Sequence, residues 1–127
     1  MHPNAALLER LFGAFGNDAK QISAAFDRDV VWRVPGNTVM SGEYRGRREV
    51  VEFLRRTGIE TAGTYRSQLH TVLASADWGL AVYRATGTRN GIDLDVNQAL
   101  VVHFDGDGFI TEVTAVPLDS AFDAFWS

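Results

Sequence analysis

Residues 78–104 of this chain are WGLAVYRATGTRNGIDLDVNQALVVHF. The Asn90-Gly91 pair at the centre is the strongest short-range signal for a β-hairpin, because both residues tolerate the positive φ of a type I′ turn. If these two residues form the turn, Tyr83 lies opposite Gln98 on the neighbouring strand. The segment is therefore predicted to form two long antiparallel strands with a defined register.

The two faces of this hairpin differ in the size of their side chains, because successive residues of a strand point to opposite sides. One face has glycine and alanine on its first strand, and Tyr83 and Gln98 are its only large polar pair. Small residues leave room beneath a sheet, so one interpretation is a pocket in which this polar pair meets a ligand. The other interpretation is that helices fill the space and Tyr83 donates to a backbone carbonyl. The opposite face carries large apolar residues, namely Trp78, Leu80, Val82 and Val101.

The overall composition is that of an ordinary globular protein. The chain has 127 residues, of which 46% are hydrophobic and 22% charged, so we expect a single domain over residues 1–127. The net charge of −4 argues against a nucleic-acid surface. No apolar run approaches the ~20 residues needed to span a bilayer, and the N-terminal segment lacks the pattern of a secretion signal. We therefore expect a cytoplasmic protein that binds neither nucleic acid nor membrane.

Metal-ligating residues are few and scattered. The chain has no cysteine, and its histidines, His2, His70 and His103, lack the spacing that places two ligands on one helix face. Asp105 and Asp107 alternate as in a calcium loop, but the closing glutamate of that pattern is missing, which favours a plain turn. We expect no bound metal and no cofactor.

Apolar residues at helical spacing predict three helices in the first half of the chain. The first spans residues 4–16 with Asn4 as its possible N-cap, and the second follows a cap at Asp18. The third is predicted in the stretch 48–58 and is expected to end just before Gly58. These helices are expected to act as packing elements.

A short strand is predicted over residues 30–36, because Val30, Trp32 and Val34 alternate with polar or outward residues and Pro35 ends the pattern. This alternation places Trp32 towards the core and Arg33 on the other face. Residues 36–46 show no periodicity and are expected to form a long loop that lies over a cavity mouth.

The second half of the chain has the period of β-strands. In residues 64–74, alternation separates Tyr65, Leu69 and Leu73 from the face that carries His70. A bulge in this strand would reverse the alternation and turn His70 inward, where its imidazole would be a candidate base. The last strand ends at Pro117, and the aromatic tail after it is expected to dock as a short helical turn.

Helices gathered first and strands gathered afterwards predict an α+β fold with the helices on one face of the sheet. Four long strands joined by tight hairpins must twist and coil. A curved sheet wrapped around helices encloses a cone, and the Tyr83/Gln98 face is expected to form its inside.

This order of elements, together with VVWRVPGNTVMSGEYRGRREVVEFL, FDGDGFITEV and LDSAFDAFWS, resembles the SnoaL-like branch of the nuclear transport factor 2-like superfamily over nearly the whole chain. The resemblance implies a cystatin-like conical barrel, in which three N-terminal helices pack on a strongly curved antiparallel sheet. It also implies a homodimer formed through the outer sheet face. The superfamily includes steroid isomerases, polyketide cyclases, epoxide hydrolases, dehydratases and proteins without catalytic activity, so it implies no single reaction.

The catalytic residues of these relatives have no clear match in this chain. A steroid isomerase would have carboxyl groups at two positions where this chain has Arg33 and Leu100. Epoxide hydrolases use an Asp-Arg-Asp set, but Arg84 and Asp95 lie on the predicted outer face and are expected to form a surface ion pair. The cyclases pair an aspartate with a histidine, whereas His70 and the other strand histidine also fall on the outer face. A gap-free match to the isomerases would turn Arg33 inward, which would suggest an acidic ligand.

Three hypotheses for function follow. The first is a pocket that binds a small, mostly apolar, oxygenated molecule such as a polyketide or terpenoid and performs isomerase- or cyclase-type proton transfer. The second is the same pocket in a carrier without chemistry, and the third is a structural dimer whose cone is filled by side chains. Catalytic residues are left unassigned, and the expected pocket residues are Trp32, Tyr83, Gln98, Leu100 and Val113.

Overall fold

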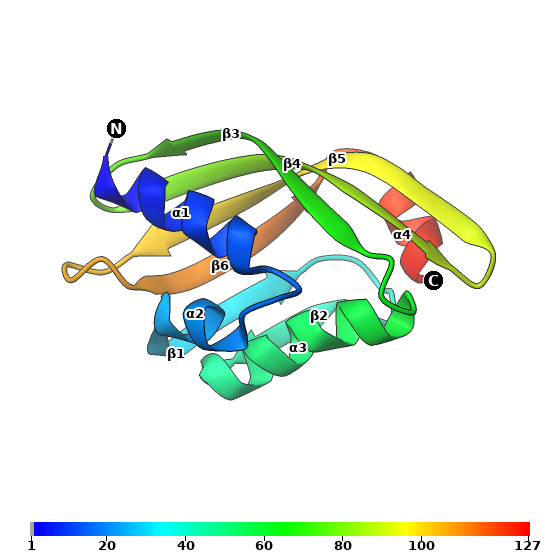
Figure 1. Ribbon diagram of the computed structural model, residues 1–127, viewed down its shortest axis with the longest axis horizontal. Helices are drawn as coiled ribbons and strands as arrows, with labels where there is room; N and C mark the ends of the chain where they lie inside the picture. Colours follow the sequence, from blue (N-terminus) through cyan, green and yellow to red (C-terminus); the bar gives the residue numbers. More distant parts are fainter. Residues whose placement is uncertain (1) are drawn as a thin grey trace.

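The computed structural model describes residues 2–127 and shows a curved six-stranded sheet with helices against its concave side (Figure 1). The strands are β1 (Phe26–Val34), β2 (Gly42–Arg45), β3 (Arg66–Ala74), β4 (Trp78–Arg89), β5 (Ile92–Phe104) and β6 (Ile110–Pro117). The helices are α1 (Pro3–Ala14), α2 (Ala19–Ala24), α3 (Gly46–Glu60) and α4 (Ala121–Trp126). The order of strands across the sheet is β2-β1-β6-β5-β4-β3. The predicted α+β fold is confirmed.

The β4–β5 hairpin has the predicted register along its whole length. Tyr83 pairs with Gln98, and the pairing continues from the turn to Trp78 opposite His103. Asn90 and Gly91 have φ values of 52° and 78°, as a type I′ turn requires. The turn chemistry and the alternation of side chains therefore suffice to determine this part of the fold.

The sheet is antiparallel except at one place, where β1 and β6 run parallel. This pairing joins the first long strand to the last one, so the meander of β3 to β6 is closed against the N-terminal elements. Strand β1 starts at Phe26, earlier than predicted, and its register against β6 shifts between Phe26 and Val31. As the alternation predicted, Trp32 is buried on the inner side, while Arg33 lies outside between Glu43 and Glu112.

Helices α1 and α3 cover different parts of the concave face. Helix α1 packs on β3 and β4, whereas α3 packs on β1 and β2 (Figure 1). The small residues of β4 help to seat α1, because a Cβ atom added at Gly79 would lie only 2.9 Å from Cδ1 of Leu8. The space beneath the small residues is thus partly occupied by a helix.

The N-terminus of α1 differs from the prediction. The side chain of His2, not that of Asn4, caps the helix by accepting a hydrogen bond from the backbone N–H of Asn4. Asn4 is buried, and its side-chain amide donates to the carbonyl oxygens of Ser75 and Ala76 in the β3–β4 turn. This long-range contact competes with local capping, and it ties α1 to the sheet. Asp18, in contrast, caps α2 as predicted.

Two further boundaries were predicted incorrectly. The expected loop over residues 36–46 contains strand β2, which pairs with β1 and adds an edge strand to the sheet. Helix α3 continues through Gly58 to Glu60, and the left-handed turn follows at Ala62 and Gly63 instead. Strand β2 is held by its pairing with β1, which periodicity in a short window does not report.

Strand β3 contains the bulge that was considered from the sequence, but its effect is different from the one considered. The register against β4 shifts between Leu69 and Thr71, so His70 is the extra residue and its side chain remains exposed. The alternation reverses after the bulge: Val72 turns inward and Leu73 outward, contrary to the prediction for Leu73. His70 therefore does not face the inside of the cone.

The aromatic tail forms α4 and docks against the sheet next to β5 (Figure 1). Its three aromatic residues, Phe122, Phe125 and Trp126, are all buried. Within residues 2–127, no helix combines the length and apolar character needed to cross a membrane. The cytoplasmic location expected from the sequence stays a prediction.

Candidate ligand-binding cavity

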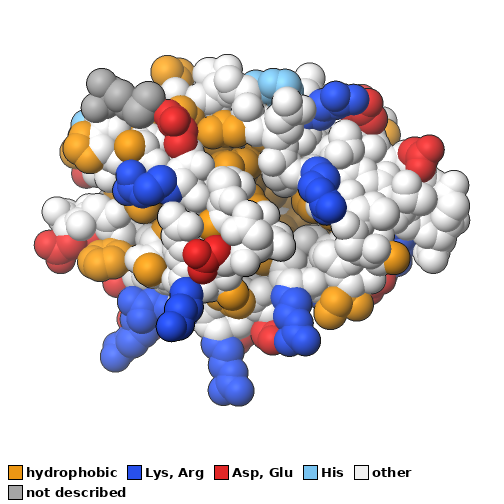
Figure 2. Space-filling model, in the orientation of Figure 1, with side chains coloured by type: hydrophobic (Ala, Val, Ile, Leu, Met, Phe, Trp, Pro, Cys, Tyr) orange, Lys and Arg blue, Asp and Glu red, His pale blue; other side chains and the backbone are white. Residues whose placement is uncertain are grey.

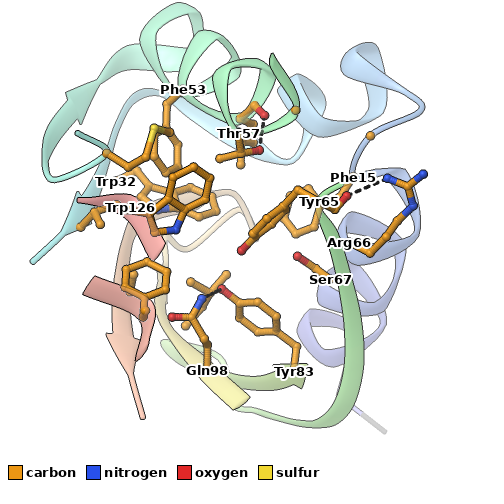
Figure 3. Close-up of a pocket in the computed structure, with 18 of the residues that line it drawn as sticks. Phe15, Trp32, Phe53, Thr57, Tyr65, Arg66, Ser67, Tyr83, Gln98 and Trp126 are labelled. Carbon is orange, nitrogen blue, oxygen red and sulfur yellow. Dashed lines mark hydrogen bonds between the residues drawn. The ribbon is translucent and has the colours of Figure 1, made fainter. Parts of the chain in front are cut away.

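A cavity of about 560 Å³ lies between the concave face of the sheet, α3, the α1–α2 turn and α4 (Figure 3). This volume is within the range of small-molecule binding sites, roughly 300–1,000 Å³. The interpretation in which helices fill the whole space therefore does not hold for this part of the cone. Figure 2 shows the corresponding hollow on the surface, with hydrophobic side chains at its floor.

Four of the five expected pocket residues contribute to the cavity wall: Trp32, Tyr83, Gln98 and Leu100. The fifth, Val113, is fully buried in the hydrophobic core and is not part of the wall. Its neighbour on the same face of β6, Ala115, does line the cavity. Alternation identifies the face of a strand, but the packing of the helices decides where along that face the space remains open.

The sheet side of the cavity carries a cluster of uncharged polar groups. The Nε2 atom of Gln98 donates to the hydroxyl oxygen of Tyr83 at 3.3 Å, and Gln98 is only 2% exposed. The hydroxyl of Tyr65 lies near both of these residues and near Ser67, whose side chains act to lower its pKa. In Figure 3 this hydroxyl points towards the centre of the cavity. The cluster therefore joins three neighbouring strands, β3, β4 and β5.

Both tyrosines of this cluster stay protonated in the physiological range. Burial raises the pKa of Tyr65 to about 12, and its hydrogen-bonding neighbours offset this rise only in part. Burial and the proximity of Tyr65 raise the pKa of Tyr83 well above its usual value of 10.0. A buried neutral phenol can donate a hydrogen bond to a ligand oxygen, but it does not serve as a base near neutral pH.

Aromatic side chains form much of the remaining wall. The rings of Trp32 and Phe53 lie 5.5 Å apart, and those of Tyr65 and Trp126 lie 5.8 Å apart. Phe15 and Phe122 also border the cavity. Such edge and tilted contacts hold the rings in place, so the wall is preformed and apolar.

Two buried polar atoms of cavity-lining residues have no hydrogen-bond partner within residues 2–127. They are the indole Nε1 of Trp32 and the side-chain oxygen Oε1 of Gln98. An unsatisfied buried donor or acceptor costs roughly 1–3 kcal/mol. Two residues of the cavity wall therefore each contain one buried polar atom whose loss of hydration is not compensated.

Helix α4 closes one end of the cavity and is held there by Arg89. The Nη1 atom of Arg89 donates to the carbonyl oxygens of Phe125 and Ser127, at 3.1 and 2.9 Å. Its guanidinium group also lies 5.9 Å from the centre of a Trp126 ring and pairs with Glu60 of α3. One arginine at the end of β4 thus joins the sheet, α3 and the helix that carries Trp126.

Side chains that are charged near neutral pH are nearly absent from the cavity wall. Among its lining residues, which all belong to the described part of the chain, the only charged side chain is Arg66, at the rim. The candidates named from the sequence lie elsewhere: His70 is exposed, and His103 bonds Thr111 on the outer face. Arg84 forms the expected surface pair with Asp95, which lowers the pKa of that carboxyl through two hydrogen bonds.

Metal coordination finds no support in the described residues. Within residues 2–127, no group of three or more histidine, aspartate or glutamate side chains is placed to hold an ion. The Asp105–Asp107 segment is a turn, in which Oδ1 of Asp105 accepts from the backbone N–H groups of Asp107 and Phe109.

The sequence hypothesis missed several contributors to the site. Tyr65 and Ser67 form part of the polar cluster, and Met40, Phe53 and Trp126 are part of the wall. A signal for the first two existed, because Tyr65, Ser67 and Leu69 alternate on one face of a predicted strand. The others approach the cavity from a loop and two helices, and only the tertiary packing brings them there.

The fold and the cavity define a conical α+β barrel of the nuclear transport factor 2-like class, in which the concave face of the sheet and the helices enclose a space for a small molecule. Solved structures of this shape are described as cystatin-like or nuclear transport factor 2-like. A model of the SnoaL-like domain matches residues 8–113, and the chain belongs to this family.

Individual relatives agree with this assignment. An uncharacterised protein of Mycobacterium tuberculosis is 35% identical over 124 residues, which cover 95% of this chain and 94% of that protein. The structure of Bal32a, from a soil-derived mobile gene cassette, is 32% identical with a TM-score of 0.92, and the match covers 98% of this chain and 96% of Bal32a. A candidate SnoaL-like polyketide cyclase from Jannaschia is 16% identical with a TM-score of 0.79, over 98% of this chain and 91% of the cyclase, which shows a shared fold alone.

Proposed function

We propose that this protein binds a small, mostly apolar, oxygenated molecule in the conical cavity. The observation that carries the proposal is the cavity of about 560 Å³, whose aromatic wall surrounds the polar cluster of Tyr65, Tyr83 and Gln98. An apolar space with a few convergent polar groups is the usual form of a small-molecule site, in which the polar groups orient the ligand. The fold relation to candidate polyketide cyclases is compatible with such a ligand.

The composition of the wall favours binding without proton transfer. Acid/base catalysis needs a group whose pKa is near the working pH and which lies within hydrogen-bond reach of the substrate. The cavity offers two tyrosines with raised pKa values and one arginine at the rim, but no carboxyl or imidazole side chain among the described residues. A carrier or ligand-sensing role therefore fits these residues better than an isomerase or cyclase.

Binding of N-phenyl-1-naphthylamine, a neutral probe that fluoresces in apolar surroundings, tests this proposal. We expect saturable fluorescence enhancement with the native protein and a loss of affinity of at least about tenfold in Ala115→Trp, since Ala115 lines the cavity. The matched control is Val116→Trp, which places the same side chain on the opposite face of β6, where Val116 is 36% exposed.

Circular dichroism establishes that both variants are folded, and Ala115→Phe is the smaller obstruction if the tryptophan variant unfolds. Equal loss of probe binding in the inner and outer variants would overturn the proposal, because the probe would then bind outside the cavity. Absence of binding by the native protein would also overturn it.

A further inference from the structure

The rim of the cavity has one charged side chain, Arg66, and its surroundings indicate the charge of the ligand. The inference rests on the proposed binding function. Arg66 lies at the start of β3, and its Nη1 atom donates to the carbonyl oxygens of Gly63 and Tyr65, both at 2.8 Å. Arg66 is exposed and alternates with the inward-facing Tyr65 and Ser67, and these two bonds bend its guanidinium group back beside the cavity entrance (Figure 3).

No carboxylate pairs with Arg66 within residues 2–127, and among the described arginines without an acidic partner, which also include Arg10, Arg47 and Arg48, Arg66 is the one that lines the cavity. Arg33 lies between two glutamates, and Arg56 and Arg89 both pair with Glu60. Arg66 keeps its charge uncompensated even though the chain has 16 acidic residues and a net charge of −4. An arginine that is oriented by carbonyl groups but lacks a counter-ion is well suited to receive an anion.

The free side of the Arg66 guanidinium has the geometry that recognises a carboxylate. Its two hydrogen bonds use Nη1 only, so Nε and Nη2 remain available. In Arg84 the same two atoms bind a carboxylate: its Nε and Nη2 donate hydrogen bonds to the two side-chain oxygens of Asp95, at 2.7 and 2.6 Å. The same bidentate edge is unused in Arg66.

The residue Tyr65 connects the rim to the interior of the cavity. Its carbonyl oxygen accepts from Arg66, and its hydroxyl belongs to the polar cluster with Ser67, Tyr83 and Gln98. A ligand lying along the Tyr65 ring would meet a positive charge at the rim, aromatic side chains beside it, and neutral donors and acceptors at the inner end. The order of these surroundings, from the rim to the inner end, matches a molecule with one acidic end and an oxygenated apolar body.

We propose that the ligand is an amphipathic monoanion, an aromatic or alicyclic carboxylic acid whose carboxylate pairs with Arg66 at the rim while its apolar body fills the cavity. The remaining wall residues are neutral, so a second charge on the ligand would be buried without a partner, which is costly. The protein thus selects for a single negative charge at one end of the molecule.

Two fluorescent probes that share one ring system test the charge preference. 8-Anilinonaphthalene-1-sulfonate carries one negative charge, and N-phenyl-1-naphthylamine is the same molecule without the sulfonate. We expect Arg66→Gln to weaken binding of the anionic probe about 5-fold, the upper end for an ion pair at an exposed site, and to leave the neutral probe unchanged. The loss should shrink as the ionic strength rises.

Arg48→Gln is the matched control, because Arg48 is an exposed arginine on α3 that does not line the cavity. It should bind both probes like the native protein. Equal weakening of both probes by Arg66→Gln would overturn the inference, since it would mean that the rim had changed shape. Unchanged binding of the anionic probe would overturn it as well.

These outcomes separate the charge preference from the proposed function. If the neutral probe binds in the cavity but Arg66→Gln leaves the affinity for the anionic probe unchanged, only the inference on ligand charge fails. If the native protein binds neither probe, cavity binding itself fails.

Discussion

The inner and outer faces of the β4–β5 hairpin come from the same strands and the same turn, but they have opposite distributions of side-chain size. On the inner face, Gly79 and Ala81 are buried, whereas on the outer face Trp78 and Leu80 are 54% and 36% exposed. The largest apolar side chains at this end of β4 therefore point away from the core. The comparison shows that available space, rather than hydrophobicity, selects the residues inside.

The reason is that helices and large rings from other elements already occupy the inside of the cone. Leu8 of α1 approaches Gly79 so closely that a methyl group there would clash, and the ring of Phe12 packs at 5.1 Å from that of Tyr83. The outer face has no such cover within residues 2–127. We propose that a second copy of the chain covers it, which is the homodimer expected from the sequence.

The largest predicted difference between the faces is in folding stability. Leu100, which is 2% exposed on the inner face, and Leu80 on the outer face can each be changed to alanine. We expect Leu100→Ala to lower the free energy of unfolding by about 2–3 kcal/mol and Leu80→Ala by less than about 1 kcal/mol, because only the first removes a buried side chain and enlarges the internal cavity. Denaturant titration at low protein concentration measures both, and equal losses would contradict the comparison.

Alkaline titration tests the same comparison for polar groups, because burial raises the pKa values of the inner tyrosines whereas the outer pair of Arg84 and Asp95 is exposed. Burial raises the pKa of Tyr65 to about 12, while the unfolded chain releases this proton near 10.0. The stabilisation, on the order of 2 kcal/mol, is therefore complete below the lower value and is lost as the pH rises through the higher one.

Tyrosinate absorbance during a pH titration of the folded protein measures this effect. Tyr65→Phe should remove one late-titrating group and flatten the alkaline loss of stability. The expectation fails if the native protein ionises all three tyrosines near their usual pKa while it is still folded.

The close contact of α1 with the inner face predicts a cost for the smallest possible substitution. In Gly79→Ala, the new methyl group would lie 2.9 Å from Leu8 and 3.0 Å from Phe104, so the helix or the ring must shift. We expect a loss of about 1–3 kcal/mol in unfolding free energy. Gly106→Ala is the control, because nothing lies within 4 Å of a Cβ atom at that turn position. Thermal unfolding that is equally affected by both changes would show that α1 is not seated as described.

The smallest of these effects concerns association through the outer face. We expect the native protein to form dimers, and Leu80→Glu to weaken them at least about tenfold, or ~1.4 kcal/mol, because a carboxylate would be buried in the interface. Ile59→Glu on α3 is the control, since Ile59 is exposed but lies away from the sheet. Sedimentation equilibrium measures the dimer dissociation constant of both variants. A native protein that remains monomeric at high concentration would contradict the proposed dimer.

Predictions from the sequence succeeded where a local signal was strong. The register of the hairpin, the cap at Asp18 and the inward position of Trp32 all depend on turn conformation, capping or alternation within a few residues. They failed where distant residues compete with local preferences. Asn4 caps nothing because the β3–β4 turn offers its amide two carbonyl oxygens, and β2 exists because β1 provides hydrogen-bonding partners.

The sequence by itself determined the α+β class, the long hairpin and the face on which Tyr83 and Gln98 lie, because these follow from side-chain alternation and from the positive φ of Asn90 and Gly91. Only the tertiary structure decided that the cone stays open beside Ala115 but is filled around Val113. It also decided that His70 stays outside on a bulge and that Arg66 stands at the rim. The physical reason is that these features depend on how helices and strands far apart in the chain fill a common volume, which no local pattern specifies.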